Sequence, residues 1–135
     1  HLELLIETNK HSYYQIVVNP AGAIMDLDRA VALSKAYDWS SQAEVAAHVG
    51  DDHWSVELRL PVTPSDEDPL HQMIGNRPLQ SKPKDLDSGK GTTLPWYFNL
   101  GRQRVRHSGT TYDAASPTGK ADFNVPRRFG KLHVR

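Results

Sequence analysis

Aromatic and planar polar side chains recur at positions where they could bind a saccharide. The C–H face of a sugar ring packs on an aromatic ring, and amide or guanidinium groups bind the hydroxyls. The candidates of both kinds are Tyr13, Gln15, Trp39, Tyr97, Asn99, Arg102 and Arg104. Strand alternation places Tyr97 and Asn99 on one face and Trp96 on the other, so we expect Trp96, like Trp54, to lie in the core. Trp39 stands in a polar stretch, which favours an exposed indole.

Clustered carboxylates could bind calcium, because this hard cation prefers oxygen ligands. Two groups could supply them: Asp26, Asp28 and Asp38, or Asp51 and Asp52. The alternative is that these acids form turns and face solvent, since the spacing of an EF-hand loop is absent from the sequence. We expect no required cofactor, and a structural calcium ion is the one addition that the acids suggest.

The seven histidines and two methionines permit two further metal hypotheses. His1 could chelate copper through its amine and ring if a second histidine came close: His48, His53 or His107. Met25 or Met73 could be an axial ligand of haem, although a lone methionine more often fills the core. No H-E-x-x-H spacing is present, and the simpler interpretation is that His1 precedes a strand.

Composition excludes several classes of site. The 135-residue chain has no cysteine, which rules out disulfides, thiolate metal sites and cysteine nucleophiles. Lys plus Arg and Asp plus Glu are 16 each, so net charge gives no pull toward nucleic acid or an anionic membrane, and we expect neither as a partner. Basic residues do cluster at 102–106 and 127–131. They could make a local anionic contact or simply solvate a strand face.

Alternation with a period of two predicts the strands that position these side chains. In 53–60, Trp54, Val56 and Leu58 point one way and the polar residues the other. Segment 12–19 alternates in the same manner and ends in an Asn-Pro-Ala-Gly turn, which predicts a hairpin with 23–26. Further strands are predicted at 2–7, 44–49, 96–102 and 128–134. Segment 28–38 could form one helical turn.

Short strands separated by Gly and Pro turns predict an all-β fold, an antiparallel β-sandwich of the immunoglobulin or jelly-roll kind. Residues 61–93 contain five prolines and form a predicted long loop that could shape a site. We expect residues 1–135 to form a single domain. Because a strand begins at once with Leu2, this domain is interpreted as the C-terminal part of a larger one.

Four strings, in chain order, resemble the family 9 carbohydrate-binding modules of environmental bacteria. Segment 4–22 is similar to the central hairpin of that family. Residues 54–61 match W-x-x-E-x-x-x-P, and residues 96–102 match W-x-x-N-x-x-R. Residues 116–118 and 126–132 match the closing S-P-T and P-x-x-F-G-x-L strings. The resemblance covers nearly the whole chain.

This resemblance implies a non-catalytic module that binds a polysaccharide or oligosaccharide, located outside the cytoplasm, either secreted or in the periplasm or at the cell surface. It also raises the expectation of structural calcium. The family has additional N-terminal strands, so a catalytic domain or a second chain could complete the sandwich. It places an aromatic residue before S-P-T, where this chain has Ala115. The alternative function is therefore a structural or interaction sandwich whose sugar site has decayed. No sequence signal pairs Glu3, Glu7, Glu44 or Glu57 as the two carboxyl groups of a glycosidase.

Overall fold

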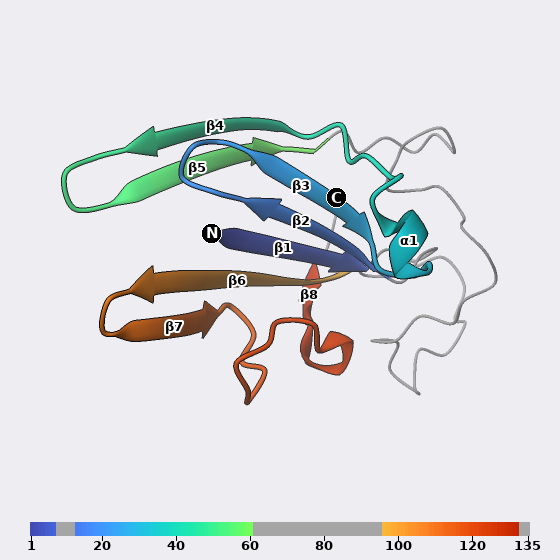
Figure 1. Cartoon of the computed structure of the whole chain (residues 1–135). Helices are drawn as coiled ribbons and strands as arrows, with labels where there is room; N and C mark the ends of the chain where they lie inside the picture. Colours follow the sequence, from blue (N-terminus) through green and yellow to red (C-terminus); the bar gives the residue numbers. More distant parts are fainter. Residues whose placement is uncertain (8–12, 61–95, 133–135) are drawn as a thin grey trace.

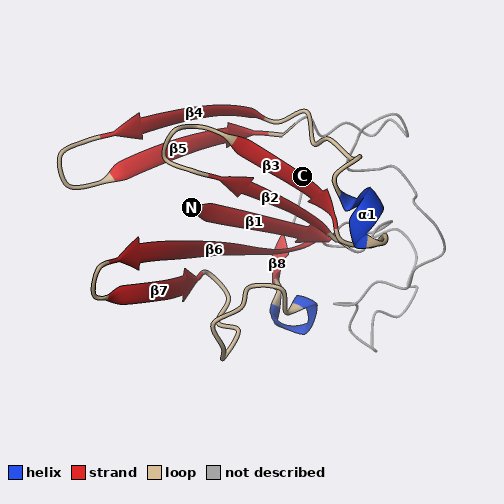
Figure 2. Ribbon diagram, viewed as in Figure 1, coloured by secondary structure: helices blue, strands red, loops and turns tan. Residues whose placement is uncertain are grey.

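The computed structural model describes residues 1–7, 13–60 and 96–132. Strands dominate these ranges, as Figures 1 and 2 show. The strands are β1 (Leu2–Glu7), β2 (Tyr14–Val18), β3 (Ile24–Asp28), β4 (Glu44–Val49), β5 (Trp54–Arg59), β6 (Trp96–Arg106), β7 (Gly109–Ala114) and β8 (Gly130–Leu132). The helical turns are α1 (Leu33–Ala36) and a 3-10 turn at Pro126–Arg128. The predicted all-β, antiparallel fold class is confirmed.

The larger sheet has β1 near its middle. Its strand order is β3-β2-β1-β6-β7, and β8 pairs with β6. All of these pairings are antiparallel. Strand β6 is 11 residues long; β8 pairs with its first part, up to Phe98, and β7 with its last part, from Gly101. The register places Leu4 opposite both Ile16 and Leu100, which fixes the side chains that share a face.

The β4–β5 hairpin covers one face of this sheet. The buried residues here are Ile6, Tyr14, Ile16, Val18 and Trp39. Val45, Val56 and Leu58 of the hairpin pack against them, as the alternation predicts. The second sheet consists of β4 and β5 (Figure 1). Two unequal antiparallel layers are thus present in the described residues, and the fuller immunoglobulin or jelly-roll sandwich stays a prediction.

The segment that follows β7 covers the opposite face. Leu5, Tyr13 and Tyr97 from the sheet form a second buried cluster with Phe123 and Phe129. The ring of Phe123 lies over the backbone of Gly101, where a Cβ atom would be 2.5 Å from one ring carbon. The sheet is therefore buried on both sides, and fewer of its aromatic residues reach solvent than alternation alone suggests.

The connections and strand ends agree only in part with the predictions from the sequence. The single helical turn predicted in 28–38 is present as α1, which is capped by Ala32 without a side-chain hydrogen bond. Strand β6 extends past the predicted end, and β7 is an addition to the predicted strands. The long loop at 61–93 lies outside the described residues, as does the side chain of Trp96. Among the helices that the structure describes, none is long and apolar enough to cross a membrane.

Candidate functional site

The three aromatic residues predicted as sugar platforms are buried. Tyr13, Trp39 and Tyr97 have relative accessibilities of 6%, 7% and 5%. Tyr13 meets Phe129 edge-on at 5.4 Å between ring centroids, and Trp39 stacks on Tyr14 at 4.2 Å. The prediction of an exposed indole at Trp39 is wrong, because the polar stretch around it folds back onto the sheet. None of the three rings offers a free face to a ligand.

Two predicted hydroxyl-binding amides are also internal. Asn99 is fully buried; its Nδ2 donates to the Ser116 carbonyl at 3.0 Å, and its Oδ1 accepts from the Ser116 backbone N–H at 2.9 Å. This pair of bonds ties β6 to the segment after β7. Gln15 is 7% exposed and donates from Nε2 to Glu3 Oε2 at 2.7 Å. Both amides are therefore occupied by protein partners.

Arg102 and Arg104 are exposed, and the structure brings both to one cleft of about 510 Å³. One wall contains these arginines with Leu2, which pairs with Arg102 across β1 and β6. The other wall contains Trp54 and Val56 of β5. We refer to the space between these walls as the inter-sheet cleft. Its lining residues lie in or near the β2–β3 and β4–β5 turns and in the last part of β6, elements that reach the left side of Figure 1.

The register explains why an indole and two guanidinium groups share this cleft. Residues two apart on a strand point the same way, so Arg102 and Arg104 share the face of Phe98. Phe98 packs against the core cluster beneath the β4–β5 hairpin, as does Val56. Trp54 is two residues before Val56 and is half-buried, at the end of the hairpin next to its turn. It therefore faces the sheet side that carries the arginines.

Most charged groups of the cleft are already paired. Arg102 donates to Asp113 Oδ2 from Nη2 at 2.6 Å and from Nε at 3.1 Å. His53 Nδ1 is 2.6 Å from Asp52 Oδ1, and His1 Nε2 is 2.8 Å from Glu3 Oε1. Arg104 has no ion pair or hydrogen bond from its side chain to the part of the chain that the structure describes.

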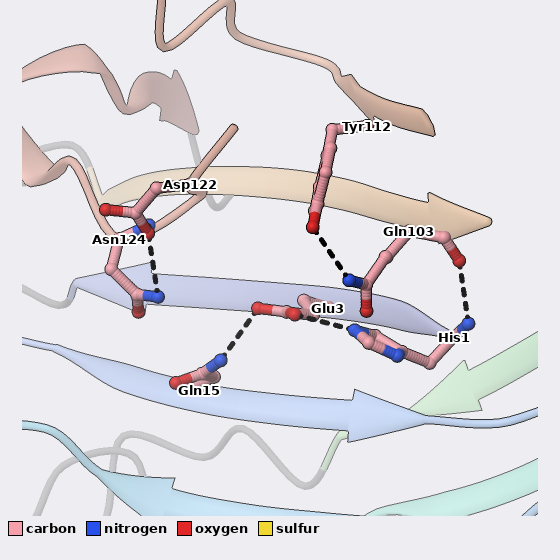
Figure 3. Close-up of polar contacts among 7 residues, drawn as sticks. All are labelled: His1, Glu3, Gln15, Gln103, Tyr112, Asp122 and Asn124. Carbon is pink, nitrogen blue, oxygen red and sulfur yellow. Dashed lines mark hydrogen bonds and ion pairs between the residues drawn. The ribbon is translucent and has the colours of Figure 1, made fainter. Parts of the chain in front are cut away.

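A second polar group lies on the opposite face of the sheet and meets the cleft at His1 and Gln103 (Figure 3). Its centre is Glu3, which binds His1 through one carboxylate oxygen and Gln15 through the other. Gln103 Nε2 donates to Tyr112 Oη at 3.0 Å. We call this set of side chains the Glu3 network; it fixes the side chains that border the cleft.

Burial and neighbouring charges shift three pKa values near these groups. Desolvation raises the pKa of Glu3, and the negative charge of Asp122 adds to this effect. Burial, and then the charge of Glu7, raise the pKa of Tyr97. Hydrogen bonds from Lys120 and from the backbone of Asn124 lower the pKa of Asp122. The fold thus disfavours ionisation of the Glu3 carboxyl and of the Tyr97 phenol, whereas it favours the Asp122 carboxylate.

The predicted calcium ligands do not meet. Asp26 accepts from the Ser41 backbone N–H and Oγ, each at 3.0 Å, and Asp28 accepts from the Ala30 N–H at 2.8 Å. Asp38 is exposed. Within ranges 1–7, 13–60 and 96–132, no group of three or more His, Asp or Glu side chains is arranged around a common metal position. Calcium binding gains no support from this geometry and stays a prediction.

Those candidate ligands of the copper and haem hypotheses that the structure describes lie at several different places. His53 lines the inter-sheet cleft with His1, but each ring is engaged by a carboxylate. His48 and His107 are exposed elsewhere. Met25 is 42% exposed on edge strand β3, and Met73 lies outside the described residues. Among the described residues, no group of three or more potential metal ligands supports either hypothesis, and both stay predictions.

Sequence reasoning missed Trp54 as a site residue, and it considered His53 only as a possible copper ligand. Alternation correctly placed Trp54 with Val56 and Leu58, and we expected all of them in the core. The usable signal was position: Trp54 is the first residue of β5 and follows a Gly-Asp-Asp turn. A hairpin end can extend past the sheet that it covers, so a residue on the apolar face there can line an open cleft.

Comparisons with protein-family models, with curated proteins and with solved structures found no match. The likeness to family 9 carbohydrate-binding modules therefore stays a prediction from the four strings.

Proposed function

We propose that this chain is a non-catalytic carbohydrate-binding module whose site is the inter-sheet cleft. One observation carries the proposal: the indole of Trp54 and the guanidinium groups of Arg102 and Arg104 line opposite walls of one cleft. Its volume of about 510 Å³ falls in the range of about 300–1,000 Å³ that is usual for small-molecule sites. A saccharide needs this combination of an apolar surface and planar donors.

Each wall supplies a different part of saccharide recognition. Trp54 provides a large, rigid apolar surface for the C–H face of a sugar ring. Arg102 and Arg104 carry fixed N–H donors that match hydroxyl and carboxylate oxygens. Because Arg102 is held by Asp113, its guanidinium is oriented before a ligand arrives, which lowers the entropy cost of binding.

Binding without cleavage fits the lining residues. Glycoside hydrolysis uses two carboxyl groups on either side of the scissile bond. Among the described residues that line the cleft, Asp52 is the one carboxylate, and it is paired with His53. Glu3 is near the cleft border, but both of its carboxylate oxygens are engaged in the Glu3 network. We therefore infer retention of a glycan rather than its hydrolysis.

The ligand type, the location and the partner that we infer follow from the same proposal. A glycan ligand of polysaccharide or oligosaccharide type fits a secreted, periplasmic or cell-surface location. A catalytic domain or a second chain is the partner that we infer, because among the described residues the hairpin sheet consists of β4 and β5 alone. A structural calcium ion stays an open part of the proposal.

The proposal is tested by measuring retention on immobilised plant, algal and bacterial polysaccharides. The wild-type chain should be retained by at least one of them, and Trp54→Ala should weaken this binding about tenfold or more, a loss of about 1.4 kcal/mol. Tyr37→Ala is the matched control, because Tyr37 is an aromatic residue, 59% exposed, that does not line the cleft.

Two results would contradict the proposal. If Trp54→Ala and the wild type bound equally well, the saccharide would lie elsewhere. If the wild type bound no polysaccharide, the carbohydrate-binding function would be wrong. Circular dichroism of the variant would establish that a loss of binding is not a loss of folding.

A docking module is the second candidate function. It is favoured by apolar side chains exposed around the same end of the molecule: Val49, opposite Trp54, is 63% exposed, and Val105, beside Arg104, is 73% exposed. Such residues can pack on a partner chain, and buried aromatic residues at the expected sugar positions agree with a decayed ancestral site. Failure to bind any polysaccharide would favour this candidate.

A further inference from the structure

The charges of the inter-sheet cleft are unequally distributed, although the chain as a whole has a formal net charge of zero. The β6 wall carries Arg102 and Arg104, whereas Asp52 is the acid on the opposite wall and is paired with His53. On the β7 side, the carboxylate of Asp113 pairs with Arg102. Among the described residues, one guanidinium of the cleft therefore lacks a paired carboxylate.

That guanidinium belongs to Arg104. Its cross-strand neighbour on β7 is Thr111, which is neutral, whereas the neighbour of Arg102 is Asp113. In the part of the chain that the structure describes, no carboxylate lies within ion-pair distance of Arg104. Arg104 also lines the cleft opposite Trp54 and Val56. An apolar wall lowers the local dielectric constant, which strengthens the attraction between this cation and an anion inside the cleft.

We propose that the cleft selects saccharides that carry a carboxylate, such as uronic acid units, and that Arg104 binds this carboxylate. The proposal rests on the carbohydrate-binding function proposed above and specifies its ligand class. A guanidinium and a carboxylate are both planar and can form two parallel N–H···O bonds. A sugar with a carboxylate at its ring edge can make this contact while its C–H face lies on Trp54. Arg102, already paired with Asp113, is left to bind hydroxyls.

The neighbouring residue Arg106 provides a control for plain charge attraction. It is two residues from Arg104 on the same strand face and is exposed, and its cross-strand neighbour is Gly109. It is not among the residues that line the cleft. Removing either arginine changes the net charge equally. A difference in binding between the two variants is therefore due to the position of Arg104 in the cleft and not to net charge.

The experiment compares binding to polygalacturonate with binding to fully methyl-esterified polygalacturonate, which has the same backbone without the charges. The wild type should bind the free acid at least about tenfold more tightly, and this preference should decrease as salt is raised. Arg104→Gln should bind both forms with the affinity that the wild type has for the ester. Arg106→Gln should keep the preference of the wild type.

The arms separate the possible failures. Equal binding of acid and ester by the wild type overturns the ligand class and leaves the carbohydrate-binding function intact. Binding of neither form, together with no binding to any other polysaccharide, overturns both proposals. A preference that survives in Arg104→Gln, or that is lost equally in Arg106→Gln, overturns the role of Arg104. Tight binding to dextran sulfate that is unchanged in Trp54→Ala indicates a general polyanion surface and also overturns the proposal.

Discussion

Glu3 is a carboxyl group whose ionisation is disfavoured by its surroundings. It lies on the central strand β1, with 14% of its side chain exposed, between His1 and Gln15. Burial raises its pKa because a carboxylate loses hydration there, and Asp122 raises it further. The hydrogen bond from Gln15 and the positive charge of Arg29 act in the opposite direction but do not cancel the shift.

This raised pKa predicts a specific dependence of stability on pH. The unfolded chain loses the Glu3 proton near the ordinary value of 4.5, whereas the folded chain keeps it to higher pH. In the window between the two values the folded state binds more protons, so Glu3 makes stability fall as pH rises. We expect the melting temperature of wild type relative to Glu3→Gln to decrease as pH increases from below 4.5 through the folded pKa.

Differential scanning calorimetry of both proteins from pH 3.5 to 7.5 would measure this difference. Titrating groups that do not interact with Glu3 contribute alike to the two proteins and are removed by the subtraction. Two groups are not removed: His1, which is bound to Glu3, and Asp122, whose charge acts on Glu3. His1→Gln in both backgrounds separates the histidine contribution. A difference that is flat or rises with pH would show that Glu3 is stabilised as a carboxylate.

At the scale of elements, the contact between β6 and the segment after β7 depends on one missing side chain. The ring of Phe123 fills the space where Gly101 has only a hydrogen, and a Cβ there would be 2.5 and 2.7 Å from two ring carbons. Phe123 is 4% exposed and belongs to the second buried cluster. The segment therefore docks on the sheet by placing a ring over a glycine.

Gly101→Ala should consequently destabilise the chain, because the added methyl group displaces Phe123 from its cluster. Overpacking of this kind costs about 1–3 kcal/mol. Gly130→Ala is the control, since its Cβ would be 3.8 Å from the nearest atoms of Phe98 and its φ angle is ordinary. Urea unfolding measures both. A Gly101→Ala variant as stable as the control would mean that the segment after β7 moves away at little cost.

The segment after β7 also shows what could and could not be predicted from the sequence. Alternation located most strands, and it correctly placed Tyr97 and Asn99 on a common face. It could not reveal that Phe123 and Phe129, more than 20 residues further along the chain, would cover that face. Alternation reports which side chains point together, whereas burial depends on what the rest of the chain packs against them.

At the inter-sheet cleft the error has the opposite direction, because a residue expected in the core lines an open space. Arg102 and Arg104 were predicted for a site, and they do line the inter-sheet cleft, whereas Trp54 was expected in the core. Trp54 does point toward the larger sheet, but the apolar cover ends before it: Val56 packs on the core cluster, and Trp54 lines the open space next to it. Where a hairpin extends past its partner sheet depends on tertiary geometry, which local pattern does not encode.

In the molecule as a whole, the two walls of the inter-sheet cleft belong to sheets that differ in strand pairing and in burial. Strand β1 is paired on both sides, by β2 and β6, and contributes to both buried clusters through Ile6 and Leu5. Strands β4 and β5 pair with each other, and most of β4 is exposed. The wall at Leu2 and Arg102 is therefore held by the central strand β1, whereas Arg104 lies where β6 pairs with β7 alone. The wall with Trp54 belongs to a hairpin whose two strands pair only with each other among the described residues.

Native-state hydrogen exchange should resolve this difference. Hydrogen-bonded amides of β1 should exchange only through global unfolding, whereas those at the turn end of β4 and β5, from His48 to Ser55, should exchange at least about tenfold faster through local opening. A saccharide that contacts both walls would favour the closed state of the hairpin, so its addition should slow exchange in β4 and β5 more than in β1. Equal protection in the free protein would mean that the hairpin opens only when the whole molecule unfolds, and the cleft would then be a rigid site whose shape exists before the ligand binds.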